Sequence, residues 1–215
     1  MDALWENRQL VLEGFGQTLT LLAAAGLTAL VLGTVLGSFR VSPVPALRAV
    51  GTAYVTCFRN SPLVVLFLLV YFGLPELDVR PSQFWRATIA LALYTSAFVC
   101  EAVRSGINAV SSGQTEAARS VGMGFGQVLR LVVLPQAFRA VVPPLASVFI
   151  ALTKNTSLVA GFGIADATFR MRGLINDNPG DVYLIFVGIA GGYILIVAAI
   201  SVVARFLERS PVRSR

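Results

Sequence analysis

Long apolar runs alternate with short polar segments along this chain. The runs occupy residues 14–39, 49–73, 85–106, 140–161 and 182–204. About 20 apolar residues cross the hydrocarbon core as a helix, and a spanning segment must satisfy its own backbone hydrogen bonds. The alternating pattern of barrel strands is absent. The sequence therefore predicts an all-α membrane protein with five transmembrane helices, forming a single transmembrane domain over residues 1–215.

Composition supports a membrane location and argues against nucleic acid. Of the 215 residues, 56% are hydrophobic and 13% are charged, whereas soluble domains carry about 25% charged residues. The net charge is +6, but the arginines are scattered between apolar runs without interleaved aromatic residues, so we expect no nucleic-acid partner. Acidic residues outnumber basic ones before the first run, so we do not interpret that run as a secretory signal.

Basic residues are unevenly divided between the two sets of loops and termini. One set carries ten arginines, and the other carries five arginines and eight acidic residues. The ten are Arg40, Arg48, Arg104, Arg119, Arg130, Arg139, Arg205, Arg209, Arg213 and Arg215. Because basic loops stay on the cytoplasmic side of a membrane, we expect the N-terminus outside and the C-terminus inside. Residues 107–139, between the third and fourth helices, then lie in the cytoplasm.

Charged residues interrupt the second and third runs. A charge near the bilayer centre costs ~2.5–3.5 kcal/mol, so each such residue is a functional candidate. Arg59, followed by Asn60 and Ser61, is a candidate for a solute pathway, and an ion pair or snorkelling is the alternative. Glu101 precedes Arg104 by three residues on one helix face. An ion pair within the helix therefore competes with a pathway role for Glu101.

The fourth run holds four consecutive polar residues, Lys154, Asn155, Thr156 and Ser157. Together they cover every face of a helix, so they cannot all avoid lipid unless the helix is buried or locally unwound. We interpret them as part of a solute pathway or gate, with an interfacial helix end as the alternative. Two cationic residues on such a path, Arg59 and Lys154, would favour an anionic solute.

Residues 107–139 have the pattern of a short helix followed by an amphipathic return. Ser111 and Gln114 have the spacing of a capping box, which predicts a helix start near Ser111, and Gly122 should end that helix with a positive φ. The helix carries a stripe of small apolar residues: Ala117, Ala118 and Val121. Three residues of the return are expected to pack on the spans: Leu129, Val132 and Val133. A docking surface for a partner and an amphipathic loop on lipid both fit this pattern.

Motifs of catalysis and of metal binding are missing from the sequence. It has no histidine, no G-x-x-x-x-G-K-[ST] phosphate loop and no Ser-His or Cys-His pair. The two cysteines, Cys57 and Cys100, lie apart inside apolar runs. We therefore expect a chain that is not an enzyme and that holds no catalytic residue, cofactor or metal. If it drives uphill transport, another chain supplies the ATP chemistry, or an ion gradient supplies the energy.

The spacing E-A-A, three residues, G, nine residues, V-x-L-P resembles the signature of ABC-importer permeases. It is met by Glu116, Ala117, Ala118, Gly122, Val132, Leu134 and Pro135. Surrounding motifs are similar to the polar amino-acid uptake family: FRNSPL (58–63), LPQA (134–137), Pro143-Pro144 and KNTSL (154–158). Others look most like glutamate uptake permeases: RVSP (40–43), YTSAF (94–98) and residues 151–157. The chain departs from the family at Asn60-Ser61, often Gly-Thr, and at Asn155, often an acid.

This resemblance implies the permease subunit of an ATP-driven importer in a bacterial cell membrane, with glutamate or a related acidic or amide amino acid as solute. The implied partners are a second permease, related or identical, two cytoplasmic ATPases that bind ATP and Mg, and an extracytoplasmic solute-binding protein. The helix of residues 116–122 would insert in a cleft of an ATPase. The alternatives are an ion-gradient-driven carrier or channel without an ATPase, and a non-transporting scaffold.

Overall fold

The computed structural model describes residues 2–209; residue 1 and residues 210–215, among them Arg213 and Arg215, lie outside that part. Regular structure between residues 2 and 209 is helical, without strands, which confirms the all-α prediction. The α-helices are α1 (Asp2–Glu6), α2 (Arg8–Arg40), α3 (Pro45–Asn60), α4 (Leu63–Leu68), α5 (Leu74–Glu76), α6 (Gln83–Asn108), α7 (Ser112–Ser120), α8 (Phe125–Val128), α9 (Leu134–Thr156), α10 (Ala167–Asp177) and α11 (Val182–Arg209). The π and 3₁₀ segments are η1 (Leu69–Gly73), η2 (Leu129–Val133), η3 (Ser157–Phe162) and η4 (Pro179–Asp181).

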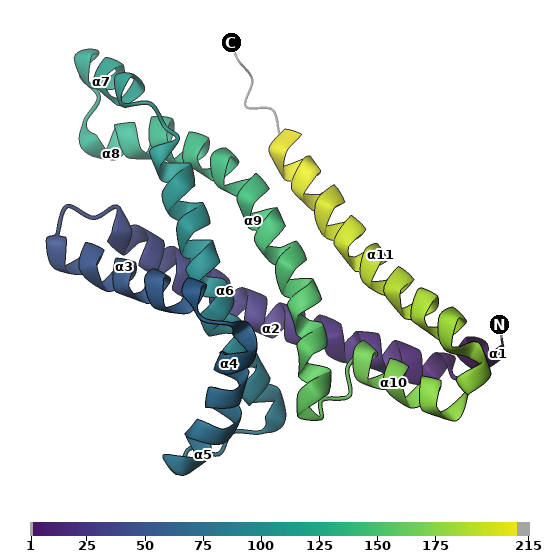
Figure 1. The fold of residues 1–215 in the computed structure, drawn as a ribbon. Coiled ribbons are helices and arrows are strands. Elements are labelled where there is room, and N and C mark those ends of the chain that lie inside the picture. The colour runs from purple at the N-terminus through teal and green to yellow at the C-terminus, as the bar shows by residue number, and fades with distance from the viewer. Residues whose placement is uncertain (1, 210–215) are drawn as a thin grey trace.

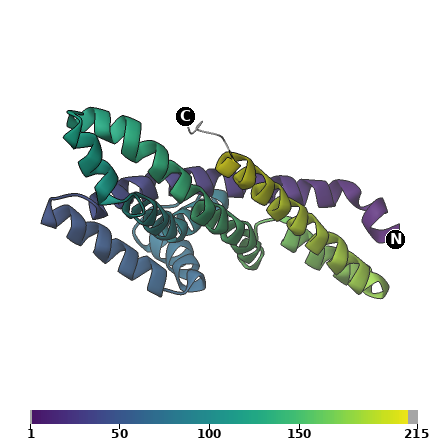
Figure 2. The ribbon, with the colours of Figure 1, turned by 90° about the horizontal axis from the view of Figure 1, so that it is seen from above.

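Long helices of the described part provide the candidate membrane crossings. Four stretches have the length and the hydropathy of a span: Arg8–Arg40, Gln83–Asn108, Phe125–Phe162 and Pro179–Glu208. A fifth crossing exists if the bent pair Pro45–Asn60 and Leu63–Glu76 acts as one span. Figure 1 shows α7 and α8 projecting at one end of the molecule, and α1 and α10 at the other. Seen from above in Figure 2, the α7–α8 end and the N-terminal end again lie on opposite sides of the molecule.

Close packing between α2 and α6 depends on glycines of α2. A Cβ atom at Gly33 would lie 2.5 Å from Val99 Cβ, and one at Gly37 would lie 2.9 Å from a methyl group of Val103. Small residues at this spacing let two membrane helices approach each other closely. The main buried cluster, which includes Phe67 and Leu152, then joins α2, α4, α6 and α9 into one core.

The second apolar run forms two helices that meet at a sharp bend. α3 and the α4–α5 segment are inclined by 103° at a break centred on Ser61 and Pro62. Proline lacks a backbone N–H and drives the residue before it into an extended conformation, and Ser61 has φ −89° and ψ 136°. The hydroxyl of Ser61 donates to the carbonyl of Cys57 at 2.8 Å, which satisfies one group freed by the break. A straight second span over residues 49–73 is thus not formed.

The segment between the third and fourth spans folds as a helical hairpin. α7 begins at Ser112, as expected, but Ser111 makes no side-chain cap and the capping box with Gln114 does not form. Gln114 accepts a hydrogen bond from Gln136 instead. Gly122 follows α7 with φ +85°, which confirms the predicted left-handed turn. The fourth span also starts earlier than residue 140, because α9 begins at Leu134.

Candidate functional site

The hairpin of α7 and α8, residues 112–128, is the first candidate site, and we call it the projecting hairpin. Val121 and Phe125 are 78% and 79% exposed on either side of Gly122. Both a partner surface and lipid could cover such apolar side chains. Glu116 and Ala117 are also exposed, whereas Ala118 is buried. The expected stripe of Ala117, Ala118 and Val121 is therefore divided between two faces of α7.

Internal contacts hold the projecting hairpin in shape. The amide of Met123 donates to the carbonyl of Ala118 at 3.2 Å, and the amide of Gly122 donates to Arg119 at 3.0 Å, which closes the end of α7. The amide of Gly124 donates to the side chain of Gln127 at 3.0 Å, at the start of α8. A small cavity of about 250 Å³ separates α7 from the return. Its lining is Thr115, Arg119, Phe125, Val128, Leu129 and Val133.

The return places the signature residues at the start of α9. Leu134 and Pro135 are exposed in the first turn of α9, where a proline needs no hydrogen-bond partner for its nitrogen. Leu129 and Val133, which were expected to pack on the spans, line the cavity beside α7 instead. The signature residues thus belong to one folded element that ends at the fourth span.

Glu101 lies at the centre of a group of arginines from three helices, and we call this group the Glu101 cluster. Arg104 Nη2 donates to Glu101 Oε2 at 2.9 Å, which confirms the ion pair expected within α6. Arg40 Nη1, from the end of α2, contacts the other oxygen, Oε1. Arg59 Nη1, from the end of α3, lies 4.0 Å from Oε2. The sequence did not indicate Arg40 as a member, because 61 positions separate it from Glu101.

Arg59 also lies beside a second feature, a pocket of mixed polar and apolar lining between α6 and α9. Its guanidinium carbon lies 5.2 Å from the ring centroid of Phe98, a cation–π distance. Phe98 lines a cavity of about 330 Å³, which we call the Thr95 pocket. Its lining is Tyr94, Thr95, Phe98, Ser147, Val148, Ala151, Leu152 and Asn155. Asn60 is exposed at the end of α3, beside Arg59.

Thr95 gives this pocket its chemical character. Its hydroxyl is buried and has no hydrogen-bond partner among the described residues. An unpartnered buried polar group costs about 1–3 kcal/mol. Asn155 supplies an amide to the same cavity from α9. The sequence named Asn155 as a pathway residue, and it singled out Tyr94, Thr95 and Phe98 only as part of a resembling motif. Ser147 was not indicated at all, because it looks like an ordinary residue of the span.

The four consecutive polar residues of α9 divide between different surroundings. Thr156 is buried and donates to the carbonyl of Thr153 at 2.6 Å, and Ser157 donates to the carbonyl of Lys154 at 2.7 Å. Lys154 is exposed and its ammonium group makes no ion pair with any described residue. The α-helix ends at Thr156 and tightens into a 3₁₀ segment. Of the four, only Asn155 lines the Thr95 pocket.

Asp166, which precedes α10, forms a buried polar junction at the opposite end of the molecule. Its Oδ1 accepts from the amide of Phe169 at 2.9 Å, and its Oδ2 accepts from the hydroxyl of Tyr193 at 3.1 Å. The amide of Ala167 donates to the hydroxyl of Thr18 at 3.3 Å. Burial raises the pKa of the Asp166 carboxyl above its usual range. This junction joins α2, α10 and α11, where the sequence indicated only a polar loop.

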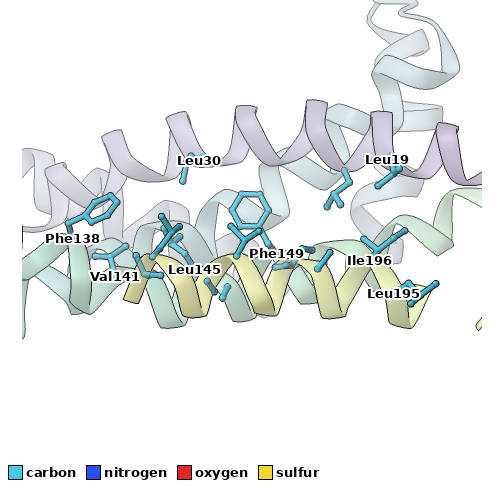
Figure 3. A pocket seen from close by; sticks show the side chains of 16 residues that line it. Leu19, Leu30, Phe138, Val141, Leu145, Phe149, Leu195 and Ile196 are labelled. Atoms are coloured by element: carbon cyan, nitrogen blue, oxygen red, sulfur yellow. The ribbon is translucent and has the colours of Figure 1, made fainter. Parts of the chain in front are cut away.

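A large apolar groove lies between α2, α9 and α11 (Figure 3). It has a volume of about 820 Å³, and aliphatic and aromatic side chains such as Leu30, Phe149 and Ile196 line it. Such walls offer no hydrogen bond to a polar solute. The Thr95 pocket, by contrast, combines hydroxyl, amide and aromatic groups.

These features define a helical membrane protein of the permease class, with a projecting hairpin at one end and a pocket between α6 and α9. The profile of the family described as binding-protein-dependent transport system inner membrane component matches residues 29–212. The chain belongs to this family. It is a multi-pass permease of the bacterial plasma membrane and a subunit of an ABC importer, so the carrier or channel without an ATPase is not supported.

Curated relatives match the chain over most of its length. It is 38% identical to a glutamate transport system permease of Corynebacterium efficiens, covering 91% of this chain and 92% of the relative. It is 36% identical to a probable glutamine ABC transporter permease of Bacillus subtilis, covering 97% and 96%. A glutamate/aspartate import permease of Escherichia coli is 34% identical, covering 92% and 85%.

Solved structures share the fold. A crystal structure of an amino acid ABC transporter with histidines has a TM-score of 0.87 and 30% identity, covering 97% of both chains. An inward-facing structure of a methionine ABC transporter has a TM-score of 0.75 and 21% identity, covering 95% of this chain and 99% of the other. The second similarity extends to the fold alone.

Proposed function

We propose that this chain imports a polar amino acid, glutamate or a related acidic or amide amino acid, with energy from a separate ATPase. Relatives named for glutamate, glutamine and glutamate/aspartate support this solute class. The chain itself carries no phosphate-binding loop, so ATP and Mg would bind to the ATPase subunits. Its further partners are a second permease, a second ATPase subunit and an extracytoplasmic solute-binding protein.

The projecting hairpin is the proposed docking element for the ATPase, and its exposed turn is the observation that carries the proposal. Val121 and Phe125 present apolar surface beside Gly122, and Glu116 is exposed one turn earlier in α7. Ala117 leaves the backbone of α7 open to close approach. The ten arginines on the same side of the spans support a cytoplasmic hairpin, an outside N-terminus and an inside C-terminus.

The Thr95 pocket and the Glu101 cluster are the proposed solute pathway. The amide of Asn155, which is partly exposed in the pocket, can bind the carboxylate or ammonium group of an amino acid. Arg59, Asn60 and Ser61 lie at the break of the second apolar run, where a bend leaves backbone groups available. Lys154 is a candidate for the outer part of the pathway, and Thr156 and Ser157 shape the end of α9 beside it.

A hairpin substitution tests the coupling role. Gly122→Trp and Glu116→Lys should each lower ATP-dependent uptake about tenfold or more and release the ATPase, because they add bulk or reverse a charge on the docking surface. Co-purification of the ATPase and uptake by whole cells are the measurements. The amount of permease in the membrane is measured beside both, because a side chain at Gly122 has free space but is strained at φ +85°.

Two controls separate docking from local strain. Gly122→Ala introduces the same strain at φ +85° without bulk, so it should keep the ATPase bound. Gly173→Trp adds the same bulk on α10, where a Cβ also meets no atom within 4 Å. Normal uptake and ATPase binding by Gly122→Trp would remove the hairpin from the coupling mechanism.

A further inference from the structure

The Glu101 cluster contains more positive than negative charge. Three guanidinium groups surround one carboxylate, which leaves the cluster with a net charge of +2. Both oxygens of Glu101 are engaged, Oε1 by Arg40 and Oε2 by Arg104. The side chains of Arg40 and Glu101 are only 17% and 21% exposed, whereas that of Arg59 is 43% exposed. Arg59 is therefore the member whose charge is most available to a ligand.

The cluster adjoins the Thr95 pocket along one face of α6. Tyr94, Phe98 and Glu101 are spaced by four and three residues, which places them on one stripe of the helix. Tyr94 and Phe98 line the pocket, and Glu101 lies one turn beyond them. Arg59 links the pocket to the cluster, because its guanidinium group lies near both the ring of Phe98 and the carboxylate of Glu101. A charge change at Glu101 would thus be felt in the pocket.

The side chain of Arg40 passes Gly51 on its way to Glu101, where any larger residue would collide with it. Gly51 of α3 faces it, and a Cβ there would lie 2.6 Å from Arg40 Cγ. The carbonyl of Leu36 lies 3.2 Å from the same Cβ position, so α2 and α3 are in close contact at this point. Arg104, by contrast, lies on the same helix as Glu101 and would pair with it in any arrangement of the spans. The Arg40–Glu101 contact, unlike the Arg104–Glu101 pair, forms only when α2 and α6 pack together.

We infer that Arg40 is a positioning residue for solute selection: it engages one oxygen of the Glu101 carboxylate and offsets its charge beside the Thr95 pocket, which leaves the more exposed Arg59 to bind an anionic group of the solute. This inference rests on the proposed import of an acidic or amide amino acid. Without Arg40, one oxygen of Glu101 loses its donor and its negative charge reaches the pocket. An additional carboxylate on the solute would then be repelled, and a neutral or cationic solute would not.

The test uses Arg40→Met in the purified complex of permease and ATPase, without the solute-binding protein. Arg40→Met keeps most of the apolar stem and lowers the net charge of the cluster to +1. Labelled glutamate is the probe, and unlabelled glutamine and arginine compete with it. Arg40→Met should weaken glutamate binding about tenfold relative to glutamine and strengthen competition by arginine. Arg48→Met is the matched control, because Arg48 is exposed and, among residues 2–209, its side chain donates to the carbonyls of Ser42 and Pro43 rather than to a carboxylate.

A second substitution separates selection from stability. Arg40→Met combined with Glu101→Gln restores the net charge of +2 and should recover glutamate binding to within about twofold of wild type. A purely structural role of Arg40 predicts further loss, because the double variant disrupts the cluster more. Equal behaviour of Arg40→Met and Arg48→Met, or no recovery in the double variant, would overturn this inference. A wild-type complex that binds none of the three amino acids would instead contradict the proposed function.

Discussion

Asp166 is a carboxylic acid that the fold removes completely from solvent. It is compatible with burial because both oxygens accept hydrogen bonds, one from the start of α10 and one from Tyr193 of α11. Burial nevertheless raises the pKa of Asp166, since the charged form loses its hydration. The stability that this group contributes is present at low pH and is lost as the pH rises through the raised pKa.

Asp166→Asn tests this balance. Asparagine keeps an oxygen that can cap α10, but its amide nitrogen cannot accept the hydroxyl proton of Tyr193, so we expect a loss of about 1–3 kcal/mol in stability. Thermal unfolding in detergent should show that the advantage of wild type over the variant shrinks as the pH rises. The exposed Asp177→Asn should keep the wild-type pH profile. A constant difference between wild type and Asp166→Asn would show that Asp166 does not titrate in this range.

At the residue scale, local spacing revealed some partners and not others. The Glu101–Arg104 pair could be predicted because both residues lie on one helix, three positions apart. The contact of Arg40 with Glu101 could not, because it depends on how α2 crosses α6 and on the space left by Gly51. The free hydroxyl of Thr95 was equally hidden, since a threonine in a span usually bonds to its own helix.

At the element scale, glycines set the distance between helices. Gly33→Ala places a methyl group within 2.7 Å of the carbonyl of Ser96 and closer still to Val99, so we expect a loss of about 1–3 kcal/mol from overpacking. Gly16→Ala lies in the same helix, and its Cβ meets no atom within 4 Å. It should be neutral or stabilising by about 1 kcal/mol, because alanine favours a helix. Similar unfolding temperatures for both variants would contradict this packing argument.

Hydrophobic runs predicted the long helices well because length and polarity are local properties of the sequence. α2, α6 and α11 each cover one predicted run, and α9 together with η3 covers the fourth, residues 140–161. The predictions of helix bounds are wrong where tertiary contacts determine where a helix begins or whether it forms. The start of α9 lies upstream of the apolar run, because the projecting hairpin supports its first turn, and α10 forms from residues that look like a polar loop. The sharp bend of the second run lies at Pro62. The sequence showed that a proline interrupts this run, but it could not give the angle of the bend.

At the scale of the whole molecule, much apolar surface remains uncovered. α11 alone exposes Tyr183, Phe186, Val187, Ile194 and Leu195. A soluble monomer rarely shows such a surface, but lipid or a neighbouring permease can cover it. The groove of Figure 3 continues this surface between α2 and α11. The single chain is thus suited to being surrounded by lipid or other apolar partners.

The orientation of the molecule can be tested with two glycines that lie beyond opposite ends of the fourth span. Gly126 lies in α8 of the projecting hairpin and Gly180 lies just before α11, and a Cβ at either position meets no atom within 4 Å. Each is changed to cysteine in a variant that lacks Cys57 and Cys100. A membrane-impermeant maleimide added to intact spheroplasts should label Gly180→Cys, and should label Gly126→Cys only after the membrane is opened.

The expected labelling follows from the charge distribution, because moving the arginine-rich loops outward is unfavourable during insertion. The opposite pattern would reverse the proposed orientation and place the hairpin where no cytoplasmic ATPase can reach it. Labelling of both cysteines from the same side would mean that α9 does not cross the membrane. The two positions therefore test the orientation and the crossing separately, and docking of an ATPase on the hairpin requires both.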